Sequence, residues 1–259
     1  MQGFSIAKPL HATMFFLSYI IRTYARITEY LTTEAQRTQR KEVLRIFCVS
    51  PNNMKTKIMK TQTTVVIEAL PMVLKIQPNI IITDDQFFDF CQLNRDLRIE
   101  RNHLGDLLIM SPTDSEADQR NFNLIGQLGI WIKQDGTGVG FGSSGGFTLP
   151  NGAVRSPDAA WIKRTKWEII PAEKRKKFAP ICPEFVVELR SENDSLSTLK
   201  EKMQEYINNG TQLAWLIYRK QRQVFIYRPN CGVEELDNPQ TLTGEDILPG
   251  FVLDLSEIW

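Results

Sequence analysis

The stretch that decides the fold runs from residue 155 to residue 210 and contains RSPDAAWI (155–162), PEFVVELRS (183–191) and LKEKMQEYINNG (199–210). PEFVVEL is a continuous apolar run that begins at a proline, which is typical of a buried central strand. SPDAAWI predicts a second strand, and residues 194–210 predict a helix that ends at Asn209 and Gly210. We therefore expect two strands and a helix at the centre of the domain.

Each of the two strand-like runs carries an acidic residue, Asp158 in the first and Glu188 in the second. A carboxylate in a buried strand loses its hydration, so it must be hydrogen-bonded, paired with a cation or bound to a metal. Mg²⁺ takes oxygen ligands from one or two carboxylates, and a bound cation can stabilise a phosphate and activate water. We predict that the two acids hold a divalent metal ion. The alternative is that they form ordinary caps or ion pairs.

A site that cuts phosphodiester bonds also needs a positive group, and three residues near Glu188 are candidates. On a helical wheel, Lys200 and Lys202 flank the apolar face of the following helix on opposite sides. Arg190 alternates to the same strand face as Glu188, but its permanent charge makes it a poor proton donor or acceptor. Spacing alone leaves the choice among the three open.

The flanking segments predict an α+β domain over residues 78–259, with a mixed sheet and helices against it. RIERN and DLLIMSP predict a hairpin, LAWLIY and QVFIYRP predict a C-terminal hairpin, and Asn151-Gly152 predicts a turn. Thr83 is a plausible N-cap of a short helix. Residues 115–134 predict a helix of roughly four turns. The residues that its spacing turns toward the sheet are Phe122, Ile125, Leu128, Gly129 and Ile132.

Composition limits the classes of function that fit this chain. The net charge is +1, so any nucleic-acid surface must be a local patch. The chain has 2 histidines and 4 cysteines that form no CxxC pair, so a zinc site is disfavoured. The cysteines are expected to be free thiols, which indicates a reducing, cytoplasmic compartment. The apolar run at residues 14–21 is too short to cross a bilayer, so no membrane association is expected.

Residues 1–77 differ from the rest and match no later pattern. Two interpretations stay open: a loosely ordered extension, or upstream sequence that is not translated, with Met54, Met59 or Met72 as the true start. No function is assigned to this segment.

Pro157-Asp158 followed by Glu188 in an apolar strand resembles the PD-(D/E)XK nuclease superfamily. More closely, residues from about 80 to 259 resemble the Uma2 (DUF820) family. The matching pieces, in order, are RIERNHLGDLLIMSP, RNFNLIGQL, SPDAAWI, FVVELRSENDS, KMQEYINNG, AWLIY and LPGFVLDL.

The resemblance implies a restriction-endonuclease-like core in which Asp158 and Glu188 hold Mg²⁺, with Mn²⁺ as a possible substitute. It also implies a further ligand from a backbone carbonyl near Leu189. Residue 190 is arginine where the superfamily has lysine. Uma2-like sequences instead carry a lysine four residues before a tyrosine, and Lys202 with Tyr206 fits that spacing.

In the same family pattern, Glu100 matches an acidic position of the first hairpin. It is expected either to be an additional metal ligand or to orient Lys202. An exposed hairpin glutamate is the alternative interpretation.

The expected function is therefore a metal-dependent endonuclease that hydrolyses DNA, with Asp158, Glu188 and Lys202 as the catalytic residues. A homodimer is a further expectation, because many nucleases that cut both strands are dimers. The first alternative is a non-catalytic nucleic-acid-binding or regulatory protein that keeps the fold, which the arginine at position 190 leaves open. The second is a structural or interaction module.

Overall fold

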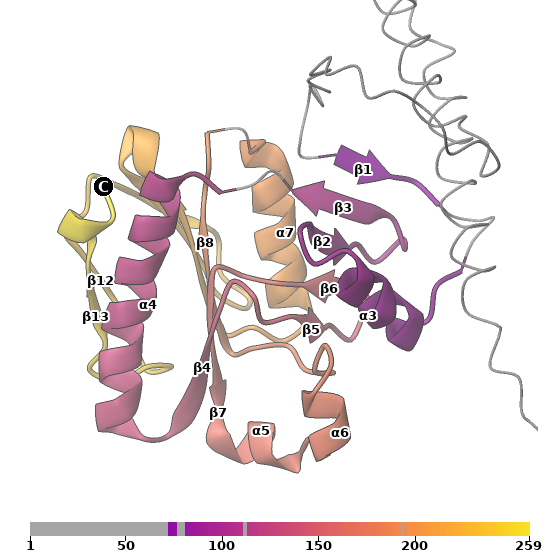
Figure 1. Ribbon diagram of the computed structural model, residues 1–259. Coiled ribbons are helices and arrows are strands. Elements are labelled where there is room, and N and C mark those ends of the chain that lie inside the picture. Colours follow the sequence, from indigo (N-terminus) through magenta and orange to yellow (C-terminus); the bar gives the residue numbers. More distant parts are fainter. Residues whose placement is uncertain (1–71, 77–80, 111–112, 193) are drawn as a thin grey trace, which may run out of the picture. The chain divides into compact units, whose positions relative to one another are not determined.

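The computed structural model describes residues 72–76, 81–110, 113–192 and 194–259 (Figure 1). The expectations for residues 1–71, including a start at Met54 or Met59, therefore lie outside the described residues. Strand β1 (Met72–Leu74) falls within the segment that the sequence pattern groups with the extension, and it pairs with β3 (Leu107–Met110).

The larger sheet has six strands in the order β11-β10-β9-β8-β7-β4. Their bounds are β4 (Gly138–Gly142), β7 (Ala159–Lys163), β8 (Phe185–Leu189), β9 (Leu213–Tyr218), β10 (Gln223–Tyr227) and β11 (Glu234–Asp237). Strand β8 is central, as its unbroken apolar run predicts. It is parallel to β9 and antiparallel to β7, so the sheet is mixed.

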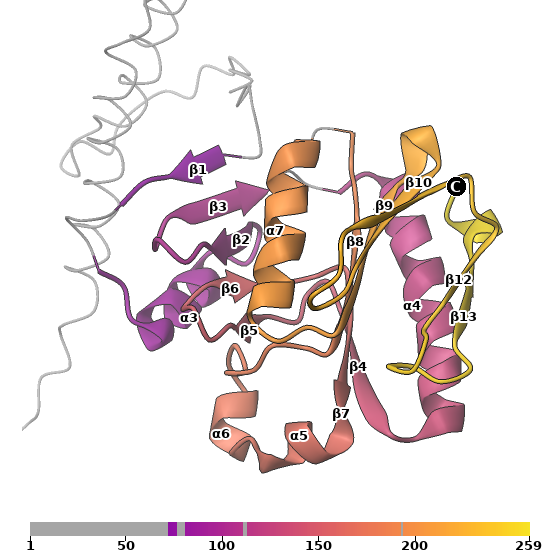
Figure 2. The ribbon, with the colours of Figure 1, turned by 180° about the vertical axis from the view of Figure 1, so that it is seen from behind.

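Helices cover both faces of this sheet. Helix α4 (Ser115–Asp135) lies on one face, and α7 (Leu196–Asn208) lies on the other (Figures 1 and 2). Successive residues of β8 alternate between the two cores: Phe185 and Val187 pack with residues of α4, and Val186 packs with Met203 and Tyr206 of α7. The same alternation turns the side chain of Glu188 toward α7.

A smaller sheet of five strands, in the order β1-β3-β2-β6-β5, adjoins the α7 side of the larger one. Its remaining strands are β2 (Arg98–Arg101), β5 (Phe147–Thr148) and β6 (Val154–Arg155). The predicted hairpins at Gly105 and at Asn151-Gly152 join β2 to β3 and β5 to β6. Helix α3 (Asp84–Leu93) packs Phe87 against this sheet, and Thr83 caps it in a capping box with Gln86, as its sequence predicts.

The glycine-rich strand β4 lets bulky neighbours approach the backbone. A Cβ on Gly138 would lie 2.1 Å from Nε1 of Trp161, and one on Gly140 would lie 2.5 Å from Cδ1 of Ile132. The glycines therefore allow Trp161 and helix α4 to pack against the strand.

Helix α4 keeps its predicted bounds to within one residue, and its 21 residues make more than the roughly four turns expected. Asp114 caps it and Gly136 ends it with a left-handed backbone. Of the predicted core-facing residues, Ile125, Leu128 and Ile132 pack against the core and Phe122 does not. The buried stripe of the helix is Leu124, Leu128 and Trp131, whereas Phe122 is 74% exposed. Phe122 lies two positions from Leu124, about 200° around the helix, so it points away from the core.

The rest of the domain follows the expected order. The basic segment after β7 forms α5 (Arg164–Ile169) and α6 (Ala172–Arg175). The 3-10 helix η2 (Arg219–Gln221) forms the connection between β9 and β10. The C-terminal segment forms β12 (Thr241–Thr243), β13 (Val252–Asp254) and η3 (Leu255–Glu257). No helix in the described ranges is both long enough and apolar enough to span a bilayer.

Candidate active site

The two predicted metal-binding acids face each other across neighbouring strands. In the antiparallel pairing of β7 with β8, Ala159 is opposite Val187, so the next pair outward is Asp158 and Glu188. Directly opposed residues of an antiparallel pair share one face of the sheet, and here that face is covered by α7. Asp158 is 9% exposed and Glu188 is 4% exposed, so both carboxylates lie inside the protein.

Asp158 is held by one backbone group and one cation. The N–H of Leu189 donates to its Oδ2 at 2.8 Å. Both Nη atoms of Arg98 donate to its Oδ1 at 3.2 Å, and Nη2 also donates to the carbonyl of Ser156 at 2.7 Å. Burial works to lower the pKa of the Arg98 guanidinium, but the charges of Asp158 and Glu188 outweigh it and raise that pKa.

Glu188 is bonded to two groups from helix α7. The Nζ of Lys202 lies 2.7 Å from its Oε1, and the hydroxyl of Tyr206 donates to the same oxygen at 3.0 Å. Burial and the nearby charge of Asp158 raise the pKa of Glu188 to about 7, although Lys202 opposes them. Glu188 is therefore a carboxyl group that changes its protonation near neutral pH.

Of the three candidate cations, Lys202 is the one that contacts a predicted acid. Lys200 instead pairs with Glu235 at 3.3 Å, on the side of α7 where it overlies Phe225. The guanidinium of Arg190 stacks 4.0 Å from the ring of Tyr218. Lys202 is thus the candidate that lies beside Glu188, and its catalytic role stays a prediction.

Lys202 is buried and lies between two carboxylates. Its Nζ is 2.9 Å from Oε1 of Glu100 in addition to its contact with Glu188. Burial works to lower the pKa of Lys202, but the charges of Glu100 and Glu188 outweigh it and raise that pKa. The amine is therefore an ammonium ion at neutral pH.

Glu100 is buried rather than an exposed hairpin residue, with 1% of its surface exposed. Its Oε1 accepts from Lys202 and from the N–H of Ser156 at 2.9 Å, and its Oε2 accepts from Arg155 at 3.1 Å. Burial works to raise its pKa, but Lys202 and Arg155 outweigh burial and lower that pKa to about 2. These contacts match the expected orienting role, while a metal-ligand role for Glu100 stays a prediction.

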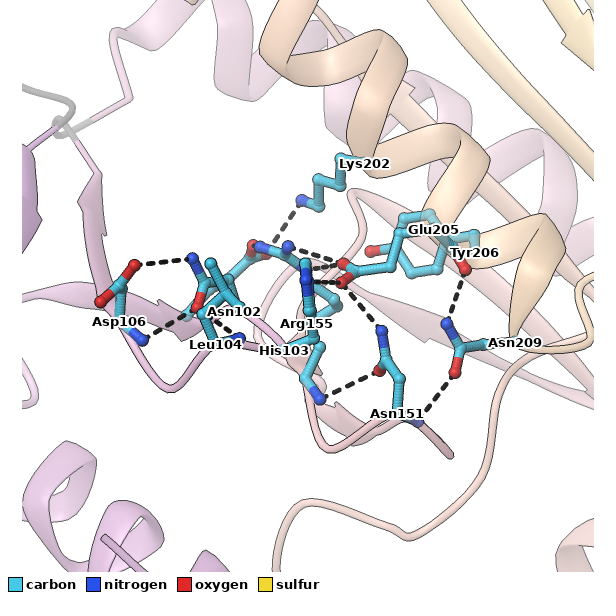
Figure 3. A network of polar contacts seen from close by, with 12 residues as sticks. Asn102, His103, Leu104, Asp106, Asn151, Arg155, Lys202, Glu205, Tyr206 and Asn209 are labelled. Atoms are coloured by element: carbon cyan, nitrogen blue, oxygen red, sulfur yellow. Dashed lines mark hydrogen bonds and ion pairs between the residues drawn. The ribbon is translucent and has the colours of Figure 1, made fainter. Parts of the chain in front are cut away.

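An outer layer of polar residues fixes Arg155, which is buried (Figure 3). Its Nε and Nη2 both lie 2.6 Å from Oε2 of Glu205 on α7. The side-chain amide of Asn151 donates to Oε1 of Glu205 at 3.0 Å, and Nδ1 of His103 lies 3.2 Å from the same oxygen. Two loop tips and one helix are thereby tied around Arg155, which in turn holds Glu100.

The donor set suits a hard divalent cation. Asp158 and Glu188 supply carboxylate oxygens on one face, which is the number of carboxylates that Mg²⁺ commonly takes from a protein. Within the described part of the chain, no group of three or more His, Cys, Asp or Glu side chains is arranged to hold a metal ion. The candidate site is therefore the pair Asp158 and Glu188.

The residue that sequence reasoning missed is Arg98. It lies two positions before Glu100 on β2, so the alternation of a strand turns both side chains to the same face. That alternation was a usable signal once Glu100 had been chosen. The pairing of Arg98 with Asp158 joins residues 60 positions apart, and no local sequence pattern indicates it.

The mixed sheet with helices on both faces, with Asp158 directly before β7 and Glu188 on β8, has the arrangement of a restriction-endonuclease-like fold. Residues 84–256 match the model of the family described as "Uma2: Putative restriction endonuclease", and the chain belongs to this family. No curated protein matches the chain.

A solved structure shares the fold. The crystal structure of "a putative nuclease belonging to DUF820" from Anabaena variabilis ATCC 29413 aligns with a TM-score of 0.55 and 20% identity. The alignment covers 69% of this chain and 97% of that chain.

Proposed function

We propose that the protein is a metal-dependent endonuclease that hydrolyses phosphodiester bonds of DNA. The observation that carries the proposal is the convergence of Asp158 and Glu188 on one sheet face, with the ammonium group of Lys202 bonded to Glu188 at 2.7 Å. Membership of a family described as restriction endonucleases supports a nucleic-acid substrate, and DNA in particular.

Asp158 and Glu188 would hold Mg²⁺ or Mn²⁺ through their carboxylate oxygens. A bound ion of this kind neutralises charge on the phosphate and lowers the pKa of a water molecule. Glu188 must be ionised to serve, so its raised pKa of about 7 in the metal-free protein means that protons compete with the metal ion for this carboxylate. Buried Tyr206 donates to Glu188 and fixes the direction of its carboxylate.

Lys202 acts as a cation and not as a general base. Because its pKa is raised, the amine has no free lone pair to accept a proton from water. It can stabilise the charge that develops on the phosphate, or donate a proton to the leaving oxygen. Glu100 holds the amine in place from the opposite side, at 2.9 Å.

The test is cleavage of supercoiled plasmid DNA in Mg²⁺ or Mn²⁺ by the parent and three variants. We expect Asp158→Asn and Glu188→Gln to lose metal-dependent cleavage. Lys202→Met should slow it by about 100-fold or more, since loss of one preorganised group commonly has that effect. Lys200→Met is the matched control on the same helix, and we expect it to cut at the parental rate because Lys200 pairs with Glu235 instead.

Parental cleavage rates in Asp158→Asn and Glu188→Gln would refute the proposed site. Titration of Mg²⁺ against the parent and Asp158→Asn by calorimetry gives an independent reading, with heat expected for the parent alone. DNA binding that weakens with salt, without any cleavage, would favour the non-catalytic alternative.

A further inference from the structure

We propose that Arg98 is a built-in counter-ion of Asp158 that the metal ion displaces, and that the freed guanidinium then binds a phosphate of the substrate. The inference rests on the proposed function and assigns a role to a residue outside its catalytic set. In the metal-free protein, the guanidinium of Arg98 takes the place beside Asp158 that the metal ion would occupy.

While Arg98 is in place, Asp158 can offer a metal ion at most one lone-pair direction, on Oδ2. A carboxylate oxygen has about two lone-pair directions. Those of Oδ1 are taken by the two Nη atoms of Arg98, both at 3.2 Å, and Oδ2 accepts the N–H of Leu189. The N–H that donates to Oδ2 belongs to Leu189, at the end of strand β8, and is held in place by the sheet. The oxygen that can be freed completely is therefore Oδ1, which Arg98 holds.

Arg98 is held more loosely than the other buried arginine of the site. Its side chain is 30% exposed, and its buried Nε has no hydrogen-bond partner among the described residues. Arg155 is 7% exposed and pairs with two carboxylates, at 2.6 Å and 3.1 Å. Arg98 can therefore move more readily than Arg155, although it must give up its bonds to Asp158 and to the carbonyl of Ser156.

The direction of that movement is set by charge. A divalent ion beside Asp158 and Glu188 repels a guanidinium, and the partial exposure of Arg98 gives it a route toward solvent, from which a phosphate would approach. A guanidinium is suited to a phosphate because its planar N–H groups match two phosphate oxygens. The same residue thus balances the acids in the absence of metal and contacts the phosphodiester in its presence.

Calorimetric titration of the protein with Mn²⁺ tests the displacement step directly, without any measurement of activity. We expect Arg98→Met to bind Mn²⁺ at least about tenfold more tightly than the parent, because no counter-ion has to leave. Arg98→Lys should fall between the two, because an ammonium cannot reproduce the forked contacts of a guanidinium. It also provides a charged variant if Arg98→Met fails to fold.

The matched control is Arg101→Met on the same strand. Arg101 faces the opposite side of β2, where it bonds to Asp84 and to the carbonyls of Ile82 and Gly152. Its loss removes the same charge without touching Asp158, so Mn²⁺ affinity should stay within about twofold of the parent. An equal gain in Arg101→Met and Arg98→Met would show a general charge effect and overturn the proposal.

Anisotropy of a labelled DNA duplex in Ca²⁺ and in EDTA tests the second step. Ca²⁺ should strengthen DNA binding by the parent more than by Arg98→Met. The variant should also have a shallower salt dependence, by about one phosphate contact. Identical salt slopes in Ca²⁺ would refute the phosphate contact.

The calorimetric outcomes separate this inference from the function on which it rests. If the parent and Arg98→Met bind Mn²⁺ equally tightly, Arg98 is not displaced and the proposed nuclease site is untouched. If neither protein binds Mn²⁺, the metal site and the inference both fail.

Discussion

Replacing Glu188 with glutamine should change how the stability of the metal-free protein depends on pH. Glutamine has the shape of a protonated glutamate and can still accept hydrogen bonds from Tyr206 and Lys202. The substitution therefore removes the titration at this position and keeps the packing. The parent, in contrast, must ionise a carboxyl that is 4% exposed and close to Asp158.

The direction of this pH dependence follows from the raised pKa of Glu188. Glu188 titrates at about 7 in the folded protein, against 4.5 for an ordinary glutamate. Folding therefore favours the protonated form, so the stability from this group is full below about pH 4.5 and is lost as the pH rises through about 7. The difference corresponds to about 3 kcal/mol in total, on the order of 2 kcal/mol of it between about pH 5 and pH 8. Glu100 does not interfere in this window, because its pKa of about 2 confines its contribution to more acidic solutions.

The assay is urea unfolding in EDTA, with parent and Glu188→Gln compared at several pH values. We expect the variant to gain stability relative to the parent as the pH rises from about 5 to about 8, by about 2 kcal/mol. Added Mg²⁺ should reverse the trend for the parent alone, because a cation favours the ionised acid. A stability difference that stays constant across this range would refute the reasoning that burial and the charge of Asp158 raise the pKa of Glu188.

Further predictions concern packing and the buried ion network. Gly138→Ala should lower the free energy of unfolding by about 1–3 kcal/mol, because the new Cβ would collide with Trp161. Gly126→Ala should raise it by about 0.5–1 kcal/mol, because Gly126 is at an exposed position of helix α4 where a Cβ meets nothing within 4 Å. Chemical denaturation compares the two, and a loss in both would contradict the packing argument. Arg155→Met should cost about 3–5 kcal/mol because it leaves two buried carboxylates without their shared cation. If the midpoint of thermal unfolding of Arg155→Met equals that of the parent, water must hydrate the carboxylates of Glu100 and Glu205 in place of the guanidinium.

Local patterns were sufficient for much of this fold. The apolar run around Val186 identified a central strand, Thr83 with Gln86 identified a helix start, and Asn151-Gly152 identified a turn. Each rests on interactions between residues that are close in sequence.

The parts that could not be predicted depend on contacts between distant segments. Nothing near Arg98 indicates that its partner is Asp158, since that pairing exists only when the smaller sheet meets the larger one. The exposed position of Phe122 was missed because an apolar residue at helical spacing was assigned to the core. Its neighbours Leu124 and Leu128 define the buried stripe instead.

The ion network around Lys202 joins the two sheets, since Glu100 comes from β2 and Glu188 from β8. Removing Lys202 leaves Glu100 and Glu188 buried without their shared cation, and removing Glu100 leaves both Lys202 and Arg155 short of a partner. Evolution by single steps would therefore pass through poorly folded intermediates. These charged residues are expected to be inherited or lost as a block, and a descendant that abandoned the chemistry would need several simultaneous replacements by apolar side chains.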